Sequence, residues 1–170
     1  MKIAVVTSTK RGEIDRLLAQ NAAFLEQRGA RLAGIVKVLE EEAGEPAHDC
    51  HMSVRVLPEG QVIQITQDLG EGSDACKLDP SAIVRAVAAV ESQPLEAAQL
   101  FILNKFGPEE AEGRGFRATI GAALEAGIPV LVGVASPSRA AFDAFVEGMA
   151  EPLAPEEEAI RAWCLEAMEL

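Results

Sequence analysis

Short apolar runs alternate with amphipathic stretches along most of the chain. The apolar runs predict buried strands over residues 2–6, 32–38, 98–103 and 129–134. Between them, apolar positions recur at helical spacing and predict helices over residues 13–28, 80–92, 109–126 and 138–149. Together the alternating elements predict an α/β fold with a mostly parallel sheet flanked by helices.

Two further segments interrupt this alternation. β-type runs at 53–57 and 61–66 flank Pro58-Glu59-Gly60, and they predict a hairpin inserted at about 52–66. A terminal helix is predicted at about 155–168, with an apolar stripe that packs back on the rest of the chain. The 170 residues, 49% of them hydrophobic, suffice for one domain over 1–170.

The composition narrows the classes of partner. A net charge of −12 makes this an acidic protein and opposes binding to nucleic acid or to anionic lipid, so we expect neither partner. The N-terminus lacks a signal-peptide pattern, and no uncharged apolar run is long enough to cross a membrane. We therefore expect a cytoplasmic protein with reduced cysteines, and no pattern indicates an oligomeric state.

The segment 7–12 joins the first predicted strand to the first predicted helix, which is the context of a phosphate-cradling P-loop, GxxxxGK[ST]. In that register Glu13 takes the position of the lysine, and Ile14 takes that of the magnesium-binding hydroxyl. This degenerate Walker A loop predicts that NTP is not hydrolysed there. Its hydroxyls, cations and helix-start N–H groups still suit an oxyanion, although a plain polar turn is the alternative. The candidate anion-binding residues are Thr7, Ser8, Thr9, Lys10, Arg11 and Gly12.

Two more segments are expected beside this loop. The carboxyl ends of parallel strands meet at one edge of a sheet, which places residues 104–110 and 135–139 near it. Asn104 then offers hydrogen bonds to an anion, and Lys105 offers a positive charge. Alternatively, Lys105 points to solvent.

Arg114 and Arg117 are spaced i, i+3 on the helix predicted over 109–126, and hence lie on one face. Two guanidinium groups there suit a bidentate clamp on a tetrahedral oxyanion. The alternative is that they pair with the nearby acids Glu110 or Glu112.

A second candidate constellation combines both histidines with two of the three cysteines. Thiolates and imidazoles suit zinc, copper or iron, so His48, Cys50, His51 and Cys76 are candidate ligands of a transition metal. Their spacing matches no standard motif, and a buried cysteine with surface histidines is the alternative. Cys164 falls on an apolar helical stripe and is predicted to be core.

Several segments together resemble a known family. QDLG at 67–70, CKLDP at 76–80 and LNKFGPEEAEGRGFR at 103–117 resemble a bacterial domain family of unknown function. Its members are often encoded near molybdenum transport or molybdenum-enzyme genes. The resemblance covers nearly the whole chain, and it implies a P-loop-type fold and a role in molybdate handling.

NKFGPE at 104–109 is also distantly similar to the second motif of a small nucleoside-triphosphatase family, DEIGP followed by an acid. Asn104 and Lys105 replace the two leading acids. The similarity thus implies that the carboxylates that hold Mg²⁺ and orient water are absent. Lys105 would then supply the cation that is lost at Glu13.

These patterns lead to one leading hypothesis and two alternatives. The leading hypothesis is a non-hydrolysing accessory protein of molybdenum metabolism that binds a small anion: molybdate, phosphate or a nucleotide phosphate. The first alternative is a divergent nucleoside-triphosphatase or phosphotransferase that uses Asp68, Asp74 or Glu109. The second is a metal-binding module built on the cysteines and histidines.

Overall fold

The computed structural model describes residues 1–39, 52–58, 60–67 and 77–170. Its strands are β1 (Ile3–Val6), β2 (Leu32–Lys37), β3 (Ser53–Leu57), β4 (Val62–Gln64), β5 (Leu100–Phe106), β6 (Val130–Val134) and β7 (Glu151–Leu153). Its α-helices are α1 (Glu13–Gln27), α3 (Pro80–Glu91), α4 (Pro108–Ala111), α5 (Arg117–Glu125), α6 (Arg139–Phe145) and α7 (Glu157–Ala167). Short 3₁₀ turns lie at Leu95–Ala97 and Ser136–Ser138.

The strands form one sheet in the order β4-β3-β2-β5-β6-β1-β7. Strands β2, β5, β6, β1 and β7 pair in parallel with their neighbours in this row. Strands β3 and β4 form an antiparallel hairpin, and β3 pairs antiparallel with β2, so the hairpin extends the sheet on that side. The predicted α/β class, with its mostly parallel sheet and inserted hairpin, is confirmed. Because β5, β6 and β1 are consecutive neighbours, the loops that follow them leave the same edge of the sheet.

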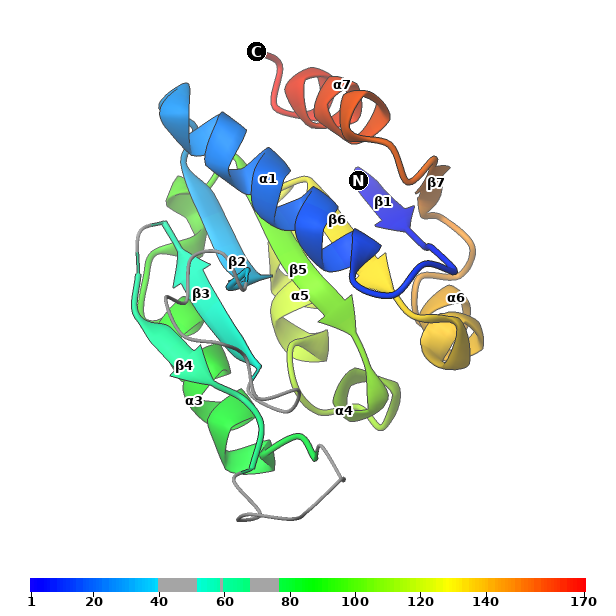
Figure 1. Ribbon diagram of the computed structural model, residues 1–170. Coiled ribbons are helices and arrows are strands. Elements are labelled where there is room, and N and C mark those ends of the chain that lie inside the picture. Colours follow the sequence, from blue (N-terminus) through cyan, green and yellow to red (C-terminus); the bar gives the residue numbers. More distant parts are fainter. Residues whose placement is uncertain (40–51, 59, 68–76) are drawn as a thin grey trace.

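Helices cover both faces of the sheet, so the fold has three layers (Figure 1). Helices α1 and α7 pack on one face through Leu17, Leu18, Ile160 and Cys164. Helices α3, α5 and α6 pack on the other. The prediction of Cys164 as core is confirmed, and burial raises the pKa of its thiol to about 12, so it stays protonated at neutral pH.

The helix starts and stops follow local chemistry. At α3, the Asp79 side chain accepts a hydrogen bond from the backbone N–H of Ser81 (2.9 Å), and Pro80 fills the first helical position. After the last residue of α1, Gly29 has a φ of 80°, a left-handed conformation that ends the helix.

Three differences from prediction bear on the sheet and on the candidate site. The single helix predicted over 109–126 is wrong, because Gly113 and Gly115 have φ of 85° and 58° and separate α4 from α5. The strand predicted over 98–103 extends to Phe106, so it includes residues that were expected in a loop. Strand β7 was not predicted; it lies at the sheet edge, where the missing N–H of Pro152 is tolerated.

One close backbone contact fixes the pairing of β2 with β5. Gly34 has a φ of 105°, and a Cβ atom there would lie 1.9 Å from the carbonyl oxygen of Ile102 on β5. No side chain fits at this distance, and the neighbouring atoms belong to the backbone, which is not free to move aside. Gly34 is therefore required for the central sheet.

We predict that Gly34→Ala lowers the free energy of unfolding by at least about 4 kcal/mol, measured by urea denaturation. Gly29→Ala is the matched control, since Gly29 also has a positive φ but no atom lies within 4 Å of its added Cβ. That control is expected to cost about 1 kcal/mol. Similar losses in the two variants would show that the contact with Ile102 is not decisive.

Candidate functional site

The three segments expected to converge do leave neighbouring strands at one edge of the sheet. Residues 7–12 follow β1, residues 135–139 follow β6, and the end of β5 leads into α4. The register aligns these strand ends, because Val5 pairs with Val132, which in turn pairs with Leu103. This edge is the candidate site, and in Figure 1 it lies around the first turn of α1 and around α4.

The first loop is closed by hydrogen bonds among its own residues. The hydroxyl of Ser8 donates to Oε2 of Glu13, and its oxygen accepts from the backbone N–H of Lys10 (3.0 Å). The ammonium of Lys10 lies 3.8 Å from Oε1 of Glu13. The loop therefore holds a carboxylate of its own chain at the position where a P-loop carries its lysine.

The remaining loop residues differ in exposure. Thr7 is partly buried, whereas Thr9, Lys10, Arg11 and Gly12 are exposed. Gly12 precedes α1 with a φ of 75°, a conformation that favours glycine. The charged and hydroxyl groups of the loop are thus presented to solvent around a tight turn into the helix.

Ile14 has an apolar packing role in place of a metal-binding one. A Cβ added to Gly133 of β6 would lie 2.6 Å from Cγ2 of Ile14 and 2.3 Å from the backbone oxygen of Asn104. Because Gly133 has no side chain, the first turn of α1 packs closely against the sheet. Consequently, this helix position offers no oxygen to a metal ion.

A β-bulge distinguishes the end of β5. Leu103 pairs with Val132 and Phe106 pairs with Val134, so Asn104 and Lys105 together lie opposite a single residue of β6. Bulges re-aim side chains at strand ends. Here Asn104 is buried and Lys105 is exposed.

The amide of Asn104 is engaged within the protein at both ends. Its Nδ2 donates to Oδ1 of Asp15 (2.7 Å), and its Oδ1 accepts from the backbone N–H of Lys37 (3.2 Å). The ammonium of Lys37 lies 3.4 Å from Oδ2 of the same aspartate. Asn104 thus connects β5 to the end of β2 and to α1.

Sequence reasoning missed two members of this group. Lys37 and Asp15 are half-buried at the candidate edge, and both were absent from the predicted set. A charged residue ending the apolar run at 32–38 was the available signal for Lys37. Nothing in the spacing of Asp15 indicated that it would reach a strand 89 residues away in the sequence.

Arg114 and Arg117 do not share a helical face, so that expectation is corrected. Arg114 lies in the turn between α4 and α5, and its Nε and Nη2 donate to the two carboxylate oxygens of Glu109 at 2.9 and 3.1 Å. The pairing lowers the pKa of Glu109, mainly through these hydrogen bonds, and raises that of Arg114. Arg117 lies over the ring of Phe145, with its Cζ 4.8 Å from the centroid.

The acid that was expected to pair with these arginines has another role. Glu110 is buried, and its two carboxylate oxygens accept from the backbone N–H groups of Gly107 (3.0 Å) and Phe116 (3.1 Å). Glu109, and not Glu110 or Glu112, is the partner of Arg114. Glu110 therefore clamps the turn between β5 and α5.

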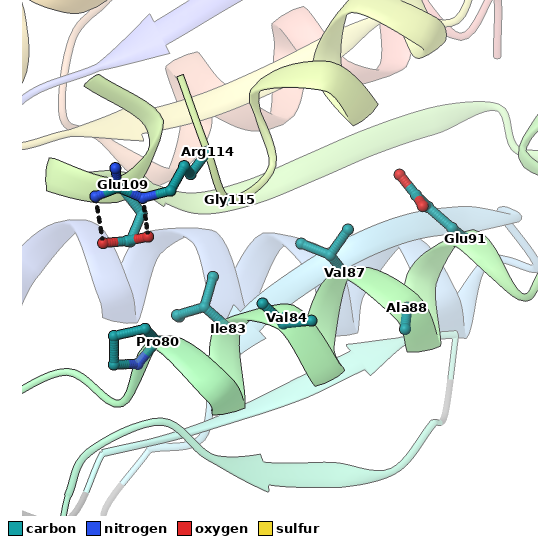
Figure 2. Close-up of a pocket in the computed structure, with 9 residues that line it drawn as sticks. All are labelled: Pro80, Ile83, Val84, Val87, Ala88, Glu91, Glu109, Arg114 and Gly115. Atoms are coloured by element: carbon teal, nitrogen blue, oxygen red, sulfur yellow. Dashed lines mark hydrogen bonds and ion pairs between the residues drawn. The ribbon is translucent and has the colours of Figure 1, made fainter. Parts of the chain in front are cut away.

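A groove of about 620 Å³ runs between α3 and this turn (Figure 2). Apolar side chains of α3 form one wall, and the Glu109–Arg114 pair lies at one end. Glu91, at the other end, accepts a hydrogen bond from the hydroxyl of Thr119 (2.9 Å). The groove therefore has an apolar wall with few free polar groups.

The proposed metal ligands lie outside the described residues: His48, Cys50, His51 and Cys76 fall within 40–51 and 68–76. Asp68 and Asp74 do so as well. Over the residues that the structure does describe, there is no cluster of three or more metal-ligating side chains. In the same described part of the chain, no helix has the length and apolar character of a membrane span.

The sheet order, the β1–loop–α1 unit and the edge at which they meet define a P-loop NTPase-like α/β protein. Residues 3–163 match the domain family described as "Protein of unknown function (DUF2478)", and the chain belongs to that family. The resemblance predicted from the sequence is confirmed.

The chain is also similar in sequence to a known protein. The chain is 34% identical over 165 residues to the molybdenum import ATP-binding protein ModC 2 of Bradyrhizobium diazoefficiens. That alignment covers 95% of this chain but only 18% of the relative's length.

Two solved structures share the fold. THEP1 from the hyperthermophile Aquifex aeolicus aligns over 100% of both chains with a TM-score of 0.66 and 12% identity. A human cancer-related nucleoside triphosphatase aligns over 99% of this chain and 96% of its own, with a TM-score of 0.64 and 13% identity. At such identities the likeness establishes the architecture alone.

We predict that Glu110→Ala lowers the free energy of unfolding by about 3 kcal/mol, because two buried N–H groups lose their acceptor. Urea denaturation measures the loss. Glu112→Ala is the control; this neighbouring acid is exposed, and its removal is expected to change stability by less than about 0.5 kcal/mol. Equal effects would contradict the clamp role of Glu110.

Proposed function

We propose that this protein is a non-hydrolysing, P-loop-like module of the cytoplasm that binds a small oxyanion at the carboxyl edge of its sheet. The ligand class comprises molybdate, phosphate and the phosphates of a nucleotide. The observation that carries the proposal is the charge of that edge. Four cationic residues, Lys10, Arg11, Lys37 and Lys105, lie on the segments that meet there, where Lys10 is paired with Glu13 and Lys37 with Asp15, in a chain whose net charge is −12.

Two of these cations are available to a ligand. Within the described part of the chain, no carboxylate lies at ion-pair distance from Arg11 or Lys105, and both side chains are exposed. The first turn of α1 adds the positive end of a 15-residue helix. A small anion at this edge would therefore gain from several charges without displacing an existing ion pair.

The absence of hydrolysis is inferred from three positions. Glu13 stands where the phosphate-binding lysine belongs, and Ile14 packs against Gly133 where a hydroxyl would hold magnesium. At the end of β5, Asn104 is a neutral amide engaged with Asp15. A neutral, occupied amide neither holds Mg²⁺ nor activates water in the manner of a carboxylate.

A role in molybdenum metabolism is supported by the relative whose name refers to molybdenum import. Because this chain spans only 18% of that protein, the module corresponds to one part of a longer polypeptide. We propose that it acts as an accessory to such a system, by binding an anionic ligand.

We predict that purified protein binds phosphate or molybdate in calorimetry and releases no phosphate from Mg-ATP. The three positions above are the reason. One of the two structures that share the fold is named a nucleoside triphosphatase. The divergent-phosphohydrolase alternative predicts magnesium-dependent release that is lost on Asp68→Asn. Such release, abolished by that substitution, would overturn the non-hydrolysing proposal.

We predict that Lys105→Ala weakens oxyanion binding by more than about tenfold, because it removes an exposed, unpaired cation from the edge. Lys105→Arg is expected to retain most of the affinity. Arg85→Ala is the control, since it removes an equal charge from an exposed position on α3. If Lys105→Ala and Arg85→Ala have the same affinity, Lys105 is not part of the site.

A further inference from the structure

Glu13 gives the first loop a property that a P-loop lacks. Its carboxylate is only 15% exposed, and Oε2 is occupied by the hydroxyl of Ser8. Oε1 lies 3.8 Å from the ammonium of Lys10, whose side chain is 79% exposed. The loop thus presents an ion pair whose cation is exposed and whose carboxylate oxygen Oε1 accepts no hydrogen bond from a described residue.

A ligand that contacts both members of this ion pair meets opposite demands. The ammonium of Lys10 only donates hydrogen bonds, and the ionised carboxylate of Glu13 only accepts them. An anion that carries no proton gains from Lys10 but is repelled by Glu13 at a short distance. An anion that still carries an O–H group donates to Glu13 through it and accepts from Lys10 through another oxygen.

We propose that Glu13 makes the loop select oxyanions that carry a proton, phosphate and phosphate monoesters, over sulfate and molybdate, which are fully deprotonated near neutral pH. This inference rests on the proposed function and narrows its ligand class. A phosphate monoester loses its second proton at a pH of about 6, so a large share of it keeps an O–H group under mildly acidic conditions. The module would then favour a phosphate-bearing ligand of a molybdenum system over molybdate itself.

The test compares inorganic phosphate, sulfate and molybdate by calorimetry at about pH 6. Wild-type protein is expected to bind phosphate at least about tenfold more tightly than either other anion, equivalent to about 1.4 kcal/mol. In Glu13→Gln, the side-chain oxygen still accepts from Ser8 while the amide N–H₂ donates to a ligand. Sulfate and molybdate are therefore expected to bind this variant about as well as phosphate does.

Glu125→Gln is the control, because it makes the same charge change at an exposed position near the end of α5. It is expected to retain the wild-type preference. If wild-type protein binds all three anions equally and Glu13→Gln does the same, the selectivity role of Glu13 is overturned while the binding function stands. If neither protein binds any of the anions, the proposed function itself fails.

Discussion

The hydrogen bonds of the Asn104 side chain hold the candidate site together. One amide connects the bulged end of β5 to the last residue of β2 and to the first turn of α1. Without it, Asp15 would lose its buried partner, and the start of α1 would lose a polar link to the sheet. This contact ties the first turn of α1 and the end of β2 to the residue that precedes the exposed Lys105.

The bulge in β5 and Gly133 of β6 lie opposite each other and act together in packing. Two residues of β5 lie opposite Gly133, whose missing side chain admits both the backbone of Asn104 and the side chain of Ile14. The extra residue turns Lys105 outward and leaves the next residue, Phe106, in the core against Phe142. A polar strand end and an apolar helix start are thereby packed against each other.

The segment at 103–117 has a mainly architectural role. Gly113 and Gly115 supply left-handed turns, Glu110 satisfies two backbone donors, and Glu109 holds Arg114 in place. Among the three cations of this segment, Arg114 is paired with Glu109 and Arg117 lies over the ring of Phe145, whereas Lys105 is exposed and has no ion pair with a described residue. Much of this sequence block is therefore explained by folding requirements, and its proposed role in binding depends on Lys105.

Periodicity was sufficient to predict the α/β class, the hairpin and most helices, because buried parallel strands and amphipathic helices leave strong local patterns. It failed where the decisive contact was distant in sequence. The Asp15–Asn104 bond and the bulge at β5 have no local signature, and the break between α4 and α5 depends on glycine conformations that helical spacing conceals. The pairing of Arg114 with Glu109 was missed for the same reason, since it follows from that break.

The atom of Ile14 that packs against Gly133 is Cγ2, the branch that isoleucine shares with threonine. The methyl branch that contacts the sheet is therefore one that threonine also has. The two residues differ at the second branch on Cβ, which is a hydroxyl in threonine and an ethyl group in isoleucine. In the proposed non-hydrolysing module, the loop backbone is therefore present without the side chains that hydrolysis uses. The scaffold is consequently a starting point from which an engineer could rebuild a magnesium-binding loop by side-chain replacement, without redesigning the turn.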